Sequence, residues 1–160
     1  MKKLLSLILL LCAFSLCFSG CRKTKDTDVI PKEDIHTEYE GVYLTCESIN
    51  TYTCKCQKPH RYNAINVVWH NETEKEVIYG EAYAIEYKNG EEWEDITPKD
   101  LYFNEIANLL EPNSTTSKTY STEHLHLSKE GHYRLVCKFS TAGGSGYKTW
   151  VEFDVEYQNS

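Results

Sequence analysis

The chain has 160 residues, of which 17 are lysine or arginine and 24 are aspartate or glutamate, so its formal net charge at pH 7 is −7. An acidic chain without a basic stripe is poorly suited to nucleic acid or to an anionic lipid surface, and a nucleic-acid partner is not expected. Twelve tyrosines and a single methionine are typical of an exported, strand-rich protein.

The first twenty residues have the pattern of a secretory signal. Lys2 and Lys3 provide a basic start, and the run from Leu4 to Phe18 is apolar apart from its serines. A membrane-spanning helix needs about 20 apolar residues, whereas this run is shorter and is followed by the polar sequence RKTKDTD. We therefore expect residues 1–20 to be a signal peptide that is removed during export.

The end of this run indicates how the mature protein is held. Phe18-Ser19-Gly20-Cys21 resembles the lipobox of bacterial lipoproteins, in which an aliphatic residue and two small residues precede the cysteine that becomes the mature N-terminus. The resemblance implies a diacylglycerol thioether on Cys21, and two acyl chains are enough for stable anchoring. An ordinary signal-peptidase cut after Ser19 is the alternative. We expect a lipid-anchored protein that faces outward from the bacterial cell membrane.

Residues 21–40 carry many charges, few large apolar side chains and Pro31. This composition predicts that the lipidated N-terminus continues into a disordered tether. The alternative is an extra edge strand at Val29 and Ile30, which is too short to stand alone. The folded domain is expected to span 41–158, a length typical of one domain.

Within that domain, apolar and polar residues alternate with the period of a β-strand. The clearest segments are 62–70, 79–87, 132–139 and 148–157. Asn89-Gly90 is a hairpin-type turn dipeptide, and the glycine-rich segment 141–146 separates the last two strands. Many short strands with turn signals predict an all-β fold, a single antiparallel β-sandwich.

The last hairpin allows a more detailed prediction of its core and register. The residues expected in the core share its inward face: Tyr133, Leu135, Val151 and Phe153. Pairing Thr141 with Tyr147 across the glycine-rich loop places Leu135 opposite Phe153. On the outward face the same register places Lys138 opposite Trp150, as a cation–π pair.

The sequence also carries a family resemblance. Gly131, Tyr133 and Leu135 have the spacing of a tyrosine corner, which begins the penultimate strand of immunoglobulin-like sandwiches. NETEKEVIYGEAYAIEYKNGEEW, followed by LLEPNSTTSKTYSTEHLHLSKEGHYRLV, resembles the bacterial immunoglobulin-like domains of small exported proteins. The similar positions run from about 62 to 139 and are mostly turn or core residues, so the resemblance implies a fold and no activity. The segment CESINTYTCKCQKPH does not belong to this pattern.

The cysteines beyond the anchor predict disulfides. They are Cys46, Cys54, Cys56 and Cys137. An even number of cysteines in an exported domain favours bridges. Side chains two apart on an extended strand are about 7 Å apart, so Cys46 is expected to pair with one of Cys54 and Cys56, and Cys137 with the other. Free thiols in an anaerobe, or a zinc site that adds His60 to Cys46, Cys54 and Cys56, are the alternatives. No cofactor or metal is predicted.

Other candidates for chemistry are weak. His124, His126 and His132 have no fitting ligand nearby in the sequence and are expected to be exposed. The glycine-rich turn lacks the lysine of a phosphate loop, and no nucleophile-elbow or zinc-protease motif occurs. The chain is therefore not expected to be an enzyme.

We expect a non-catalytic binding or structural accessory module at the cell surface, with a protein or glycan partner. The candidate contact residues are Lys138, Gly143, Gly144, Ser145 and Trp150. A proteinase inhibitor that presents the 141–146 loop, or an exported metal-binding protein, is the alternative function.

Overall fold

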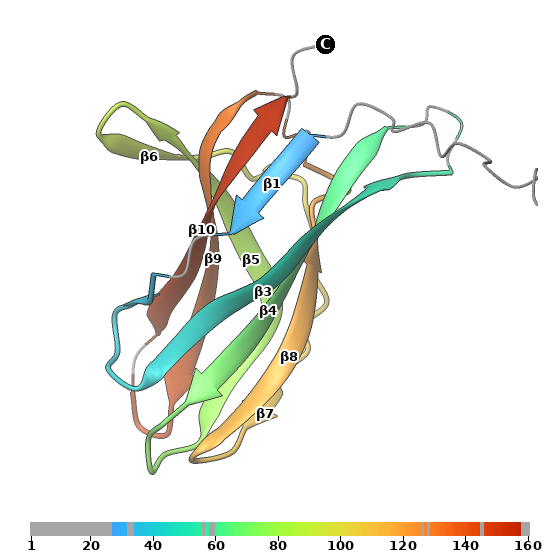
Figure 1. The fold of residues 1–160 in the computed structure, drawn as a ribbon. Helices are drawn as coiled ribbons and strands as arrows, with labels where there is room; N and C mark the ends of the chain where they lie inside the picture. The colour runs from blue at the N-terminus through green and yellow to red at the C-terminus, as the bar shows by residue number, and fades with distance from the viewer. Residues whose placement is uncertain are drawn as a thin grey trace, which may run out of the picture.

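The computed structural model describes residues 27–31, 34–55, 57, 60–125, 127, 129–144 and 146–157. The expected signal peptide, Cys21, Cys56 and Ser145 lie outside the described residues. Within the described ranges the chain consists of strands and connecting segments (Figure 1), and no helix there could span a membrane.

Two antiparallel sheets face each other. The larger sheet has the order β1-β10-β9-β5-β6, and β2 also pairs with β10 while β7 pairs with β5. Its strands are β1 (Thr27–Pro31), β2 (His36–Thr37), β5 (Val77–Asn89), β6 (Glu92–Asp95), β7 (Asn108–Leu110), β9 (Gly131–Thr141) and β10 (Tyr147–Tyr157). The smaller sheet has the order β3-β4-β8, formed by β3 (Val42–Thr53), β4 (Arg61–Asn71) and β8 (Ser114–Ser121). This arrangement confirms the predicted all-β sandwich.

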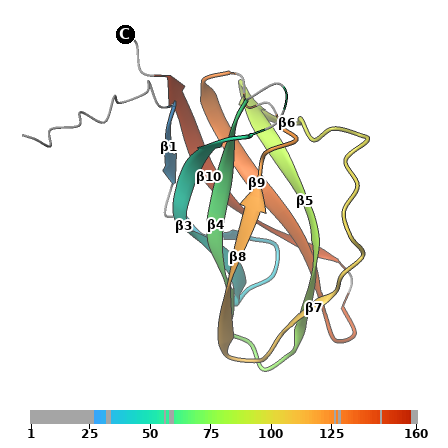
Figure 2. The same cartoon turned by 90° about the vertical axis from the view of Figure 1, so that its right-hand side faces the viewer.

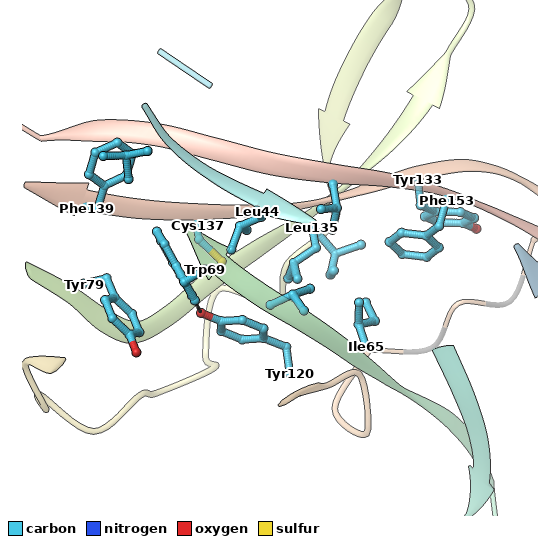
Figure 3. Close-up of a cluster of buried hydrophobic side chains, with 14 of the residues drawn as sticks. Leu44, Ile65, Trp69, Tyr79, Tyr120, Tyr133, Leu135, Cys137, Phe139 and Phe153 are labelled. Atoms are coloured by element: carbon cyan, nitrogen blue, oxygen red, sulfur yellow. Dashed lines mark hydrogen bonds between the residues drawn. The ribbon is translucent and has the colours of Figure 1, made fainter. Parts of the chain in front are cut away.

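The core lies between the two sheets. Trp69 of β4 is fully buried and stacks on Tyr79 of β5 at 4.4 Å between ring centroids, and its indole nitrogen donates to the hydroxyl of Tyr120 at 3.2 Å. Figure 3 shows these three aromatic side chains grouped beside the sulfur of Cys137. Trp69 therefore packs across the two sheets against Tyr79, while Tyr120 of its own sheet satisfies its buried polar atom.

The inward face of the β9–β10 hairpin confirms the predicted core. Tyr133, Leu135, Val151 and Phe153 are each 0–2% exposed. Full burial of such a side chain stabilises the fold by about 1.5–3 kcal/mol. These four residues therefore make a large contribution to the hydrophobic stabilisation of the domain.

The tyrosine corner is also present. The Tyr133 hydroxyl donates to the backbone oxygen of Lys129 at 2.7 Å, four residues upstream, as such corners do. Gly131 has φ +145°, and a Cβ there would lie 2.7 Å from Tyr87. Only glycine fits this position without displacing the neighbouring ring.

The register of the last hairpin differs from the prediction by two residues. The structure pairs Tyr147 with Phe139 and Val151 with Leu135, whereas Thr141 pairs with Val77 of β5. Because side chains alternate with a period of two, a shift of two leaves the inward face unchanged. The hydrophobic pattern fixes the face of each residue but does not fix its partner across the hairpin.

The prediction of a disordered tether through residue 40 is wrong for two segments. β1 pairs with β10 from Thr27 opposite Tyr157 to Pro31 opposite Phe153, and β2 places His36 opposite Trp150. A strand this short is not stable alone, but β10 has a second edge that β9 does not use, and this edge supplies hydrogen-bond partners. The folded unit therefore includes β1 and β2, which precede residue 41.

The expected hairpin turn between β5 and β6 is confirmed, with its loop one residue later than Asn89-Gly90. Asn89 pairs with Glu92, so Gly90 and Glu91 form the loop, and Gly90 has φ +64°. From β6 the segment 96–107 runs along the outside of β5 to reach β7 (Figure 2). This segment forms one wall of the surface described next.

Candidate binding surface

The outward side of the larger sheet contains a β-bulge in β5. The pairing between β5 and β9 shifts between Tyr79 and Tyr83, so that three residues of β5 lie beside Lys138 of β9. Bulges bend a strand and redirect its side chains, and they are frequent next to functional sites. Here the bulge faces the segment 96–107, since a Cβ on Gly80 would lie 3.7 Å from the backbone oxygen of Ile106.

A shallow groove of about 380 Å³ lies over this bulge. We call it the outer groove and define it by Ile78, Glu105, Ile106, Lys138 and Gly146. Ile78 and Ile106 are 45% and 51% exposed, and Leu109, which pairs with Ile78, is 52% exposed at the rim. Three exposed aliphatic side chains close together mark this face as a candidate for association.

Two lysines flank the outer groove. Lys138 and Lys148 lie directly opposite each other on β9 and β10, and both are exposed. Neither forms a salt bridge with any residue in the described part of the chain. Like charges directly opposite across two strands repel each other. Lys138 and Lys148 thus place two positive charges beside the groove, whose lining also includes the acidic Glu105, in a chain whose net charge is −7.

Trp150, predicted to lie beside Lys138, lies elsewhere. It is paired with Val136, its ring stacks on His36 at 5.3 Å with an angle of 8°, and its Nε1 donates to Glu152 at 3.2 Å. The predicted Lys138–Trp150 pair is therefore wrong, because the register is shifted by two and because β2 brings His36 over the indole.

Gly143 and Gly144 form a tight turn. Gly143 has φ +80°, the Gly144 amide donates to the backbone oxygen of Thr141 at 2.9 Å, and a Cβ on Gly144 would lie 2.6 Å from the Thr141 hydroxyl. The loop thus packs on its own residues, and among its described residues only Gly146, at its end, reaches the outer groove.

A second polar cluster surrounds His132 on the same sheet face. Its Nδ1 lies 2.7 Å from Asp154 Oδ1, and its Nε2 lies 2.7 Å from Glu152 Oε2. Ionised carboxylates only accept hydrogen bonds, so this geometry fits an imidazolium that donates from both nitrogens. Such a ring has no nitrogen left to serve as a general base.

Neighbouring side chains of the same cluster also shift the pKa of Glu152. Burial raises the pKa of Glu152, but hydrogen bonds from His132 and Trp150 and the nearby charge of His36 outweigh this effect, so that its pKa is lowered overall. Beside it, the Arg134 guanidinium forms an ion pair with Glu86 and lies over the rings of Trp93 at 4.3 Å and Trp150 at 5.0 Å. The cluster is internally paired and acts as a structural network.

The predicted disulfides of Cys46 and Cys137 are wrong, because both are free thiols. Cys137 is buried in the core, where desolvation raises its pKa to about 12, and Cys46 lies in mid-strand opposite Val67, where burial raises its pKa to about 11. Cys54 is disulfide-bonded, and its partner lies outside the described residues.

The structure also changes the set of residues in the alternative zinc site. Cys46 does not lie with Cys54 and His60; the third member of that cluster is Glu123, from the segment after β8. Sequence spacing could not suggest Glu123, because 63 residues separate it from His60 and only the pairing of β4 with β8 brings them together.

Comparison with protein families agrees with this architecture. A family model described as a bacterial Ig-like domain matches residues 47–158. The chain belongs to the bacterial Ig-like domain family. The match confirms the resemblance, and it extends into the cysteine-containing segment that the sequence pattern left out.

Two further comparisons add little to the family assignment. A crystal structure of a Bordetella pertussis protein provisionally assigned as ApaA is 15% identical to this bacterial Ig-like chain, covers 74% of it and 97% of its own length, and has a TM-score of 0.43. No curated protein matches this bacterial Ig-like chain. Its function is therefore argued from its own surface.

The sequence prediction missed the aliphatic residues of the outer groove. Ile78 lies between the inward-facing Val77 and Tyr79, so an apolar residue at an outward position was a visible signal. Ile106 and Leu109 belong to DLYFNEIANLL, whose mixed pattern gave no direction for its side chains. Only the bulge and the path of 96–107 bring these residues together.

Proposed function

We propose that this protein is an exported, non-catalytic binding module, held by lipid on Cys21 at the outer face of a bacterial membrane, whose outer groove binds an acidic, partly apolar segment of another envelope protein. The observation that carries the proposal is the outer groove itself. It combines exposed aliphatic side chains with two exposed lysines that form no salt bridge within the described part of a net acidic chain.

The charges favour a partner that carries carboxylates. Repulsion between Lys138 and Lys148 is relieved when an anion lies between them. Complementary charges also speed association and reject partners of the wrong sign. An acidic segment would therefore be drawn to this part of the surface and repelled by most of the remainder.

The aliphatic side chains favour a polypeptide over a glycan as the partner. Ile78, Ile106 and Leu109 gain free energy when apolar side chains remove their surface from water, at about 25 cal/mol per Å². A glycan offers mainly hydroxyl groups to such a surface, and these would lose water without gaining hydrogen bonds from aliphatic carbons. A segment with alternating acidic and aliphatic residues satisfies both features of the groove.

Binding to the outer groove can be tested with peptides of defined pattern. The full chain is expected to bind peptides of alternating aspartate and leucine more tightly than matched peptides of lysine and leucine. Lys138→Glu combined with Lys148→Glu should reverse this preference, because it inverts the charge beside the groove. Lys55→Glu, in the segment that follows β3 of the other sheet, is the control and should leave the preference unchanged. Equal binding of both peptide classes, or a double variant that behaves like the unaltered chain, would refute the proposed partner.

The anchor is tested separately. Cys21→Ser in a bacterial host should release the protein from the membrane fraction, because the lipid thioether cannot form without the thiol. Without attached acyl chains, the protein has no stable anchor in the bilayer. Metabolic labelling with a fatty acid should mark the unaltered protein and not the variant. Retention of the variant on the membrane, or release of the unaltered protein to the medium, would show that the segment is an ordinary signal.

A further inference from the structure

Cys54, His60 and Glu123 meet at one end of the smaller sheet. Cys54 follows β3 and His60 precedes β4, and the Cys54 amide donates to the His60 backbone oxygen at 2.9 Å, which closes the hairpin end. Glu123 follows β8, and the neighbouring Thr122 is tied to Asn63 of β4 by an amide-to-carbonyl bond of 2.7 Å. The strand pairing thus holds three potential metal ligands at fixed positions.

The imidazole of His60 is oriented as it is in metal sites. Its Nε2 lies 3.0 Å from the backbone oxygen of Glu123, and because a carbonyl only accepts, Nε2 carries the proton. In the neutral ring Nδ1 then presents its lone pair, and it lies 3.4 Å from Cys54 Sγ. A histidine that ligates a metal through one nitrogen commonly donates from the other to a backbone carbonyl.

The spacing suits a tetrahedral ion of the zinc type. With a Zn–S distance of about 2.3 Å and a Zn–N distance of about 2.05 Å, tetrahedral geometry separates sulfur from nitrogen by about 3.6 Å. The ligand atoms of all three residues lie within 4.8 Å of one another. Within the described chain the Glu123 carboxylate forms neither a hydrogen bond nor an ion pair, so it is available as the third ligand.

Cys54 is disulfide-bonded, and this controls the ligand set. A sulfur in a disulfide carries no negative charge, whereas the thiolate is the form that ligates metals. We propose that Cys54, His60 and Glu123 form a redox-gated site for a zinc-like divalent cation, closed while Cys54 is in its disulfide and open once that bond is reduced.

The gating step is an ordinary thiol–disulfide exchange. A dithiol reductant transfers two electrons and two protons to the S–S bond; the reductant becomes a disulfide, and Cys54 and its partner sulfur become thiols. On metal binding the Cys54 thiol releases its proton to water, and the sulfur donates an electron pair to the ion. The mixed sulfur, nitrogen and oxygen ligands select zinc or cobalt over magnesium and calcium, which prefer oxygen alone.

The site is tested with Co²⁺ as the probe, because thiolate ligation gives cobalt a visible charge-transfer band. The full chain is titrated in its oxidised form and after treatment with a dithiol. The band is expected only in the reduced protein, and Zn²⁺ should displace it. Cys54→Ser should abolish the band. His60→Ala should weaken binding at least ~10-fold, since loss of even an outer partner of a ligand costs 10–100-fold.

Two controls separate this site from other thiols and from misfolding. Cys46→Ser removes a free thiol outside the cluster and should leave the band intact. Glu123→Gln keeps the size and fold of the segment but removes the charge, so it should weaken binding while leaving the thermal unfolding midpoint of the metal-free protein unchanged. A band in the oxidised protein, a band that survives Cys54→Ser, or reduced protein without a band would each overturn the proposal.

Discussion

The inward and outward faces of the β9–β10 hairpin differ in what holds their side chains in place. On the inward face Leu135, Val151 and Phe153 are fully buried and depend on packing alone. On the outward face His132 and Glu152 remain partly exposed and depend on partners of opposite charge. Packing tolerates any register of the hairpin that leaves the same apolar residues pointing inward. Charge pairing, in contrast, requires one particular partner across the hairpin. The two faces should therefore respond differently to substitution and to pH.

The largest effect is expected from Phe153→Ala. The ring is fully buried and stacks on Tyr133 at 5.8 Å between centroids. Its removal leaves a cavity and should lower the free energy of unfolding by about 3–5 kcal/mol. Urea unfolding measures this loss, which should be the same at pH 5 and pH 8. A loss below 1 kcal/mol would show that the inward face is not packed as described.

Glu152→Gln should have an intermediate effect that depends on pH. The pKa of Glu152 is lowered in the folded state, so its contribution is present above its unfolded value of about 4.3 and is lost as pH falls through the folded value. At pH 7 the variant should lose about 1–3 kcal/mol, because hydrogen bonds from His132 and Trp150 then lack a charged acceptor. The loss should shrink as the pH falls below 4. A loss that is constant with pH would contradict an electrostatic role.

Tyr133→Phe should have the smallest effect. It sharpens the comparison because Tyr133 is a residue of the inward face that also makes a polar contact. It keeps the ring in the core and removes only the bond to the Lys129 backbone oxygen. The expected cost is about 0.5–1.5 kcal/mol in the free energy of unfolding. Thermal unfolding, with Tyr62→Phe as a control on the outer side of the smaller sheet, measures the difference. Equal behaviour of the two variants would exclude the tyrosine corner as a stabilising contact.

The sequence predicted those features of the fold that follow from the alternation of apolar and polar residues along a strand. Which residues of the hairpin face inward follows from a period of two, and the structure confirms Leu135 and Phe153 in the core. The pairing of Val151 with Leu135 could not be derived, because a shift of two leaves every side chain on its face. The hydrogen bond of Tyr133 could be anticipated, because its partner is close in the sequence.

The features that the sequence could not predict are formed by residues that are far apart in the chain and meet only in the folded structure. Cys137 and Cys54 are both cysteines of the predicted β-sandwich domain, and nothing in their spacing shows that one lies in the core between the sheets and the other at the end of the smaller sheet. The outer groove required the bulge in β5, and the Glu123 position required the pairing of β4 with β8. Each combines residues that are separate in the chain, so no local pattern could reveal it.

The edge position of β1 has a mechanical consequence. If lipid holds Cys21, residues 21–26 are the only chain between the bilayer and the first paired residue, and six residues reach about 20 Å at most. Tension on this link would act first on the pair of Thr27 with Tyr157, at the end of a ladder that can open one pair at a time. Loss of β1 and β2 would release the chain up to residue 41 and extend the reach to about 70 Å. Under load the N-terminal strands would thus act as a reserve of length, while the sandwich that carries the outer groove stays folded.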